Sequence, residues 1–450
     1  MATKRQKKKA YNTAKKVAKK NPTLFIVLIL VVLLIGGGIF AYLIISGKIN
    51  FNKTNDNNNN NTKESINVDN IKYKDFQIHF MELGNNNSGD SVYIKAGEND
   101  ILIDAGSRGN SATTIIDYVK DYCTDGKLEY VISTHGHQDH IAGFAGVSDN
   151  KAKNFKGESV DKTGVLYYFE VETFIDFAYY KNVDNKTANI DDYSTSTEYG
   201  KYLRARNYII ENNTTYYTAK ELWNQNKTTF QLADNITMDI LYNKYYFETS
   251  GDENNYSVCT LFNFNEHHFI LTGDLEEAGE QALAAYYDGS TPKKTLPHCD
   301  LFKGGHHGSP TSSNDCLLEK ITPDICCVCC CAGDTEYTSN YLNQFPTQEF
   351  INRIAKYTSN VYVTTMYDEV KKKNKSMNGN IVVSSDGKEV GIDASNNLTK
   401  LKDTEWFNAE IYVDASNNNV SKKGNTDFYD KDTPNSKKVK RRIWPDYGVA

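Results

Sequence analysis

The sequence predicts a layered α/β domain behind a single transmembrane helix. Three observations lead to this prediction: a long uncharged apolar segment, short apolar strands that alternate with amphipathic helices, and polar clusters where the strands end. Of the 450 residues, 39% are hydrophobic and 24% are charged. Most of the chain can therefore form a packed core, which excludes a wholly disordered protein.

The uncharged segment covers residues 23–46 and is rich in Leu, Ile and Val. At ~1.5 Å per residue, a helix of this length spans a hydrocarbon core of roughly 30 Å. A cleavable signal peptide is the alternative, but its apolar core usually has ~7–15 residues before a small-residue cleavage site. The basic residues 1–22 are expected to stay in the cytoplasm. We therefore expect a single-pass protein of the cell membrane with the rest of the chain outside.

The net charge of −6 conceals an asymmetry. The first 20 residues hold nine Lys or Arg and no acid, which leaves 42 basic against 57 acidic residues, or −15, for the remainder. Binding of nucleic acid mainly through a basic surface is therefore disfavoured. Two local basic groups are interpreted as solvated loop and tail: Lys371, Lys372, Lys373 and Lys375, and Lys437, Lys438, Lys440, Arg441 and Arg442.

Composition divides the rest of the chain into three parts. Residues 47–70 are rich in Asn and have few apolar side chains to bury, which predicts a disordered linker. Residues 71–395 carry the alternating strands and helices and form the expected folded domain, in which all candidate site residues lie. Residues 396–450 form a polar C-terminal extension of unknown role.

Within residues 71–395, apolar runs predict strands at 76–81, 91–94, 101–103, 130–133 and 269–271. Helical spacing of apolar residues predicts helices at 115–122, 276–287 and 350–357. Since the polar residues of interest follow the strands, we expect the site along one edge of the sheet.

The densest polar motif runs from Thr134 to His140 and contains His135, His137, Asp139 and His140. In a loop, residues two positions apart can face the same side, so His135 and His137 can bind one metal ion while Asp139 and His140 face a second. Imidazole with carboxylate suits Zn, Mn or Fe better than Ca or Mg. A solvated polar loop is the alternative, and this number of ligands at this spacing argues against it.

Two metal ions need further ligands, and later segments offer them. Asp274 ends a strand, where its carboxylate could bridge two cations or cap the following helix. His306 and His307 lie between glycines, which let the backbone approach a metal closely. The sequence does not show which of the two histidines binds metal and which stabilises or protonates the leaving oxygen.

Together these residues resemble the metallo-β-lactamase fold, an αββα sandwich, and especially the hydrolase domain of competence proteins of the ComEC/Rec2 type. The resemblance covers roughly residues 76–395 and includes Gly89-Asp90-Ser91 and Leu102–Gly106. It implies that Asp104 supports the metal-binding loop from behind. It also implies a metal-dependent hydrolase that uses two divalent ions, expected to be Zn with Mn or Fe as alternatives.

The resemblance implies phosphodiester cleavage, in which two cations lower the pKa of a shared water towards 7 and so supply a hydroxide nucleophile. The substrate is expected to be nucleic acid or a cell-wall polymer such as choline-bearing teichoic acid, and no protein partner is implied. One departure concerns the ligands. No histidine occurs from 141 to 266, so the site of His135 and His137 is open, weaker or completed by another group such as Asp176.

Two other functions stay open: hydrolysis of another ester, thioester or lactam, and a non-catalytic binding protein that retains the fold. Five cysteines, Cys326, Cys327, Cys329, Cys330 and Cys331, lie in a short apolar run, which favours a buried strand over a metal cluster. His267 and His268 are interpreted as edge-strand residues.

Overall fold

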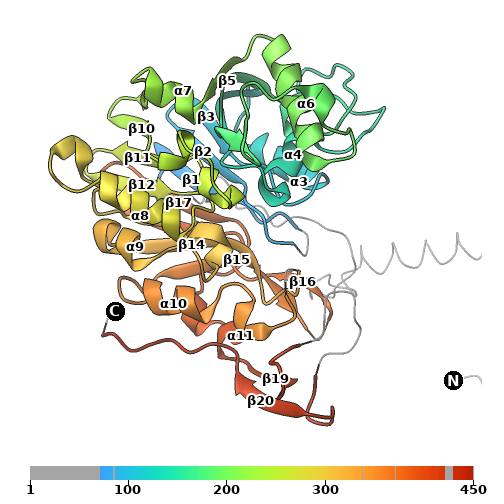
Figure 1. The fold of residues 1–450 in the computed structure, drawn as a ribbon, viewed down its shortest axis with the longest axis vertical. Helices are drawn as coiled ribbons and strands as arrows, with labels where there is room; N and C mark the ends of the chain where they lie inside the picture. Colours follow the sequence, from blue (N-terminus) through green and yellow to red (C-terminus); the bar gives the residue numbers. More distant parts are fainter. Residues whose placement is uncertain (1–70, 85–86, 337, 370, 421–428, 449–450) are drawn as a thin grey trace, which may run out of the picture. The chain divides into compact units, whose positions relative to one another are not determined.

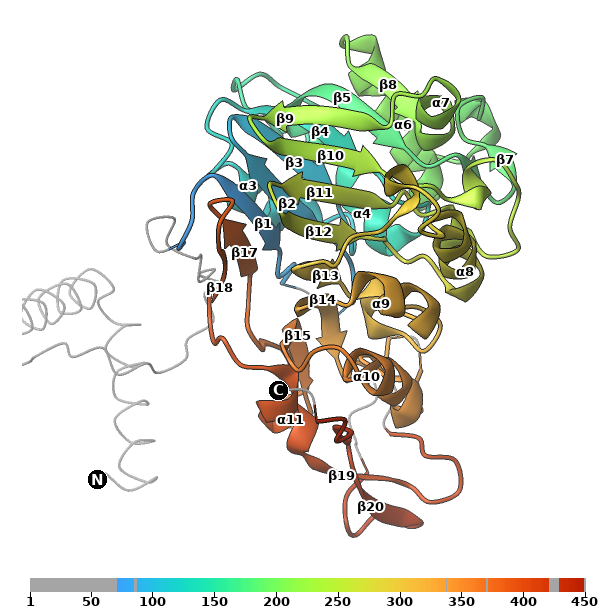
Figure 2. The ribbon, with the colours of Figure 1, turned by 90° about the vertical axis from the view of Figure 1, so that its left-hand side faces the viewer.

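Two eight-stranded β-sheets lie face to face with helices on both outer sides (Figures 1 and 2). This computed structural model describes residues 71–84, 87–336, 338–369, 371–420 and 429–448. The predicted α/β class is confirmed. No helix among the described residues is both long and apolar enough to cross a bilayer. The predicted anchor at 23–46, with residues 1–22 and 47–70, lies outside the described residues.

The first sheet has the order β18-β17-β1-β2-β3-β4-β5-β8. Its strands are β1 (Phe76–Phe80), β2 (Val92–Ala96), β3 (Asn99–Ile103), β4 (Lys127–Ile132), β5 (Glu170–Asp176), β8 (Thr215–Thr218), β17 (Ile381–Ser385) and β18 (Val390–Ala394). Strands β3, β4, β5 and β8 form one parallel block. The other pairs, β2–β3 included, are antiparallel.

The second sheet has the order β16-β15-β14-β13-β12-β11-β10-β9. Its strands are β9 (Thr229–Ala233), β10 (Ile236–Ile240), β11 (Thr260–Phe264), β12 (His267–Leu271), β13 (Leu301–Lys303), β14 (Ile325–Ala332), β15 (Val361–Asp368) and β16 (Lys373–Ser376). Strands β12 to β15 are parallel. The two sheets therefore each contain a parallel block whose strands end at the same edge.

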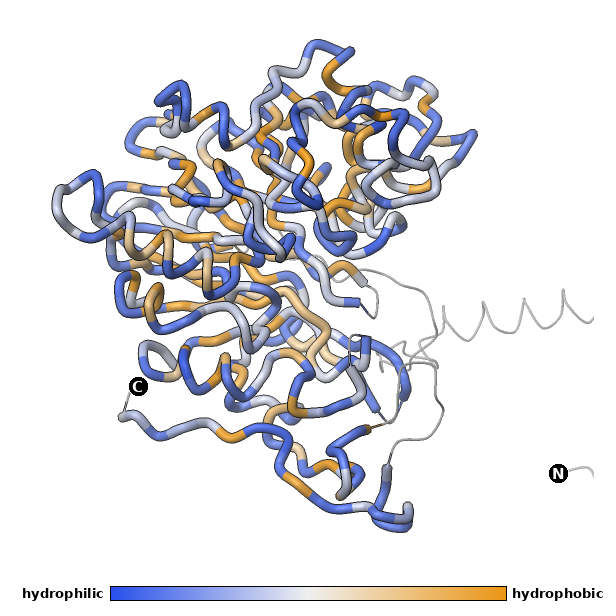
Figure 3. Tube along the Cα trace, viewed as in Figure 1, coloured by the Kyte–Doolittle hydropathy of each residue, from blue (hydrophilic) through white to orange (hydrophobic). Residues whose placement is uncertain are grey.

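Alternation along the strands makes the core. On β1, Phe76 faces the second sheet, and its ring centroid lies 4.9 Å from that of Phe269. His79 points to the opposite face, where its Nδ1 lies 2.8 Å from the hydroxyl of Tyr118 on α3. Apolar residues follow the strands and inner helix faces, while peripheral loops are largely hydrophilic (Figure 3).

The described α-helices are α3 (Ser111–Val119), α4 (Gln138–Ala145), α5 (Val165–Tyr168), α6 (Glu198–Glu211), α7 (Ala219–Asn224), α8 (Glu277–Tyr286), α9 (Asp315–Ile321), α10 (Gln348–Ile354) and α11 (Glu405–Asn408). Buried residues of α3, α4 and α6 belong to the core of the first sheet. Those of α8, α9 and α10 pack on the second sheet (Figure 1).

The cysteine-rich run forms the central strand β14, as predicted. All five of its thiols are buried. Cys327 and Cys329 face the core between the sheets, whereas Cys326 and Cys330 face the core beneath the helices. The small apolar thiols thus fill both sides of a strand that is covered on both faces.

Residues after 396 pack against this domain. Leu401, Trp406 and Phe407 join the core on the outer side of the second sheet, and Trp406 is 2% exposed. Strands β19 (Glu410–Asp414) and β20 (Ser436–Lys440) then form a separate antiparallel hairpin. Although this segment is polar in composition, a few of its apolar residues pack into the core of the domain.

Candidate metal centre

Four strand ends bring the predicted ligands together. Strands β3 and β4 of the first sheet end before Asp104 and the 134–140 motif, and β12 and β13 of the second end before Asp274 and the adjacent His306 and His307. Both pairs are parallel, so their carboxyl ends meet at one edge. The site therefore lies where the edges of the two sheets converge.

Asp104 supports the metal-binding loop from behind. Its Oδ1 accepts a hydrogen bond of 2.7 Å from the backbone N–H of Thr134, and its Oδ2 accepts one of 2.7 Å from the Thr134 hydroxyl. The same Oδ2 lies 2.8 Å from Nδ1 of His140. With Nδ1–H donated to this carboxylate, His140 presents its Nε2 to the site.

Two glycines pack so closely against the 134–140 loop that no side chain fits at their positions. An added Cβ on Gly106 would lie 1.4 Å from the carbonyl oxygen of Asp139. A Cβ on Gly89 would lie 2.9 Å from the same oxygen. Any side chain at either position would displace the first turn of α4, which carries Asp139 and His140.

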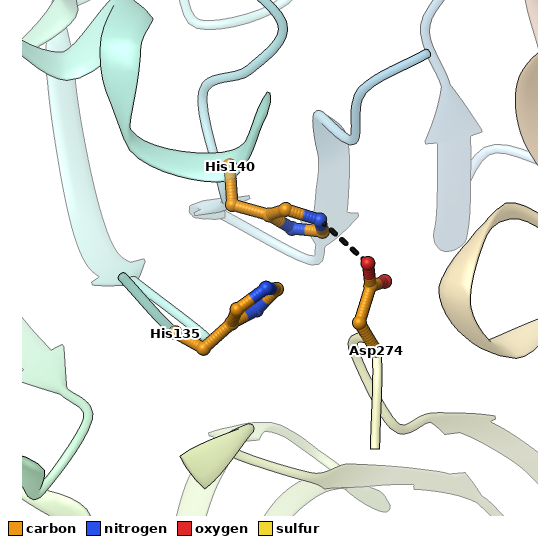
Figure 4. Close-up of side chains that lie close together, drawn as sticks. All are labelled: His135, His140 and Asp274. Carbon is orange, nitrogen blue, oxygen red and sulfur yellow. Dashed lines mark hydrogen bonds and ion pairs between the residues drawn. The ribbon is translucent and has the colours of Figure 1, made fainter. Parts of the chain in front are cut away.

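Asp274 is the residue that the donor groups share. His135, His140 and Asp274 place ligand atoms within 4.8 Å of one another (Figure 4). The Oδ2 of Asp274 lies 3.0 Å from Nε2 of His140 and 3.3 Å from Nε2 of His307. Asp139, His140 and His307 form a second group of the same size. A carboxylate between two such groups is placed to bridge two cations.

His137 lies at the edge of this cluster, with its Nδ1 3.1 Å from Nε2 of His135. His135 is buried, and His137 is half-buried. His135, Asp139 and His140 therefore belong to donor groups, whereas His137 belongs to none of those found among the described residues.

The two adjacent histidines take different positions, because both have left-handed backbone angles, with φ 44° at His306 and 54° at His307. His307 is buried, and its Nδ1–H donates to the carbonyl of Cys329 at 2.8 Å. Its Nε2 then faces Asp139 and Asp274 at 3.4 and 3.3 Å. His306 is 22% exposed, and its Nδ1 lies 3.2 Å from Oε1 of Glu276.

Two charged residues at the centre were not identified as site residues from the sequence. Lys303, the last residue of β13, is 2% exposed, and its Nζ lies 2.5 Å from Oδ2 of Asp90. Asp90 is 1% exposed and forms a donor group with Asp274 and His307. Lys303 also donates to the carbonyl of Gly273 at 3.2 Å. The sequence signals were the Gly89-Asp90-Ser91 turn of the family resemblance for Asp90 and a position at the end of a strand for Lys303.

Asp176 belongs to another buried network. Its carboxylate accepts hydrogen bonds from Tyr202 at 2.5 Å and Tyr216 at 3.0 Å, and lies 3.6 Å from Arg206. It belongs to none of the donor groups found among the described residues. His267 is also engaged elsewhere, 2.8 Å from Asp300 at the opposite end of β13.

Burial and charge set the protonation of the donors. Burial, followed by the neighbouring His140 and His137, holds the pKa of His135 well below its usual value, so this ring is neutral. Burial also lowers the pKa of His137. For His140 and His307, burial acts in the same direction, but nearby carboxylates, chiefly Asp274, raise the pKa well above 6.5.

The donor set fits divalent metal ions. His307 Nε2 and Asp274 Oδ1 are buried atoms for which the described residues provide no hydrogen-bond partner. Both point into a group of imidazoles and carboxylates, the ligands that Zn, Mn and Fe use in proteins. The residues that would hold such ions are those of two overlapping groups: His135, His140 and Asp274, and Asp139, His140 and His307.

Metal affinity is expected to rise with pH. His140 and His307 must lose their protons to bind metal, so the association constant should increase up to about tenfold per pH unit for each displaced proton as pH rises towards their raised pKa. The folding stability of the metal-free protein should instead fall as pH rises. The raised pKa of these histidines contributes stability below about pH 6.5 that is lost as pH rises through their folded-state pKa. Competition with a chromophoric chelator and thermal unfolding at each pH measure both trends, and a pH-independent affinity would contradict the assignment.

Comparison with known proteins identifies the fold family. Residues 84–163 match the model of the metallo-beta-lactamase superfamily. Recombination protein 2 of Haemophilus influenzae is 28% identical over 163 residues, which cover 36% of this chain and 17% of that protein. The aligned region is thus about one sixth of that relative's length.

Among solved structures, the metallo-beta-lactamase fold protein YhfI of Bacillus subtilis is 11% identical, with a TM-score of 0.31 over 64% of this chain and 96% of that one. The diiron β-hydroxylase CmlA of Streptomyces venezuelae is 11% identical, with a TM-score of 0.30 over 57% of this chain and 44% of that one.

Over residues 84–163 the chain is thus similar to the metallo-β-lactamase superfamily, and its fold and donor groups support a metal-dependent hydrolase in general. The likeness to recombination protein 2 is limited to 28% identity over 36% of this chain.

Proposed function

We propose that this chain is a membrane-anchored phosphodiesterase whose catalytic domain faces the outside of the cell. Its substrate would be nucleic acid or a phosphodiester of a cell-surface polymer. The apolar segment at 23–46 and the basic residues before it support the anchor and its orientation. The resemblance to the ComEC/Rec2 type favours phosphodiester over lactam cleavage.

The observation that carries the catalytic proposal is the position of Asp274 between two groups of metal donors. Divalent ions bound there would supply an acidified water as nucleophile and positive charge near the electrophile. Asp274 holds the donors together through its contacts with His140 and His307. We expect Zn, with Mn or Fe as the alternatives.

His306 is the best-placed proton donor for the leaving oxygen. Its Nε2 lies 3.9 Å from Asp274, on the exposed side of the donor cluster. Glu276 holds the other ring nitrogen. Burial opposes ionisation of Glu276, but its hydrogen bonds with His306 and Asp252 lower its pKa to about 2, so it stays a carboxylate and orients the ring.

A matched pair of substitutions separates these roles. We expect His307→Ala to lose at least one metal ion per chain, because its Nε2 faces both Asp139 and Asp274. We expect His306→Ala to keep the wild-type metal content and to lower kcat by about 10²–10⁴, the range for a general acid. Elemental analysis and kinetics on the full chain in detergent measure the two effects. Equal metal loss in both variants would contradict the assignment.

A substrate panel tests the reaction class. The full chain, loaded with Zn, Mn or Fe, is assayed on bis-p-nitrophenyl phosphate, single-stranded DNA, teichoic acid, a thioester and a lactam. Turnover of the phosphodiesters supports the proposal. Turnover of the thioester or lactam alone would assign another hydrolase class. Absence of both metal and turnover would favour a binding protein that retains the fold.

A further inference from the structure

We propose that Arg442 is a positioning residue that braces the loop 339–346 and thereby fixes Phe345 as an aromatic wall of the catalytic site. Only one part of this inference rests on the proposed function: that the wall contacts a ring or apolar group of the substrate. Arg442 follows strand β20, and both it and Arg441 are buried, so the interpretation of this basic group as a solvated tail is wrong for these two residues.

Phe345 borders the exposed side of the donor cluster. Its ring centroid lies 5.7 Å from that of His306 and 6.1 Å from that of His307. The side chain is half-buried, so part of the ring covers the two histidines and part is accessible. Its carbonyl accepts a hydrogen bond of 2.9 Å from the N–H of Gly333, just after β14. The ring is therefore a side wall for anything that approaches His306.

The guanidinium of Arg442 holds the backbone around Phe345. It donates to the carbonyls of Pro346 at 2.8 Å, Gln344 at 2.5 Å and Tyr341 at 3.0 Å. These acceptors lie on both sides of Phe345 in the chain. Arg442 is 3% exposed. A planar fork with five N–H donors can satisfy several carbonyls at once, which a lysine ammonium cannot do in this geometry.

The same C-terminal segment holds the two ends of the loop. The N–H of Val420 donates to the carbonyl of Ser339 at 2.6 Å, and the N–H of Tyr341 donates to that of Asn418 at 3.2 Å. At the far end, Ile443 and the side chain of Gln348 exchange hydrogen bonds of 2.9 and 2.6 Å. The loop is therefore contacted at both ends by Asn418, Val420 and Ile443, and Arg442 is its central contact.

The test compares Arg442→Gln, Arg442→Lys and Phe345→Ala with the control Lys440→Gln in the full chain. Lys440 is an exposed cation on the same segment, two residues before Arg442. The first measurement is amide hydrogen exchange of residues 339–346. The second is the rate at which diethylpyrocarbonate modifies His306, read by mass spectrometry. The third is kcat and KM on bis-p-nitrophenyl phosphate, with metal content measured in parallel.

We expect exchange of the loop to rise about tenfold or more in Arg442→Gln, less in Arg442→Lys, and not at all in Lys440→Gln. Modification of His306 should accelerate in both Arg442→Gln and Phe345→Ala. KM should rise about tenfold in these two variants, with kcat changed less and metal content unchanged. A general loss of folding would instead raise exchange throughout the domain and lower metal content.

Unchanged exchange of residues 339–346 in Arg442→Gln would overturn the brace. Unchanged modification of His306 in Phe345→Ala would overturn the wall. Neither measurement needs turnover. A wild-type protein that cleaves no phosphodiester would refute the proposed function, and the exchange and modification rates would still decide this inference.

Discussion

Replacing Asp274 with asparagine is expected to lower kcat by at least about 10³-fold and to reduce the metal content from about two ions to one or fewer. Loss of one preorganised electrostatic group costs about 10²–10³ in other hydrolases. Asp274 should exceed that range because its carboxylate contacts both His140 and His307 and belongs to two donor groups. Elemental analysis and single-turnover kinetics on the full chain measure the two losses.

Asp300→Asn is the matched control. Asp300 pairs with His267 at 2.8 Å, but it precedes β13, at the end opposite to the donor cluster. We expect this variant to retain metal and turnover. The backbone N–H of Asp274 donates to Oγ of Ser257 at 3.1 Å, a bond that asparagine retains, so the variant should keep its fold. Wild-type metal content in Asp274→Asn would show that the carboxylate does not bridge the donors.

Lys303→Met is expected to destabilise the metal-free protein by about 3–5 kcal/mol, the cost of removing one partner of a buried ion pair. Without the ammonium, the buried carboxylate of Asp90 would face Asp274 without its compensating cation. Burial tends to lower the pKa of Lys303, but Asp90 and Asp274 raise it, so the lysine is charged in the folded protein. Thermal or urea unfolding of the metal-free chain measures the change.

Two further variants show whether the loss comes from the unpaired charge. In Lys303→Met/Asp90→Asn both charges are removed, and more than half of the lost stability should return. Lys356→Met removes an exposed partner of Asp315, where both side chains are 40% exposed, and should change stability by less than about 1 kcal/mol. If the Lys303 and Lys356 variants unfold alike, the ion pair has no special structural role.

The fold and most of the donor set could be predicted because their signals are local. The strands β1, β3, β4 and β12 are short apolar runs, and the 134–140 motif concentrates its ligands within a few residues. A strand end followed by Gly-Asp or His-His can be recognised from the few residues around it. These are the features that hydrophobic patterning and ligand spacing encode directly.

The contacts that complete the site are long-range and could not be predicted in this way. Asp90 and Lys303 are single charges beside apolar strands, and only the meeting of the two sheets pairs them. The different orientations of His306 and His307 depend on backbone angles that the dipeptide does not determine. The role of Arg442 stayed hidden because its acceptors are backbone carbonyls, which leave no trace in side-chain composition.

The donors come from two separate halves of the sandwich. His135, Asp139 and His140 follow β4 of the first sheet, whereas Asp274 and His307 follow β12 and β13 of the second. A cation shared by these residues is a cross-link between layers built from distant stretches of chain. Such a cross-link would slow the separation of the layers, so bound metal would contribute to the lifetime of the folded state as well as to chemistry. In the proposed extracellular location, the supply of metal would then determine how long each molecule survives.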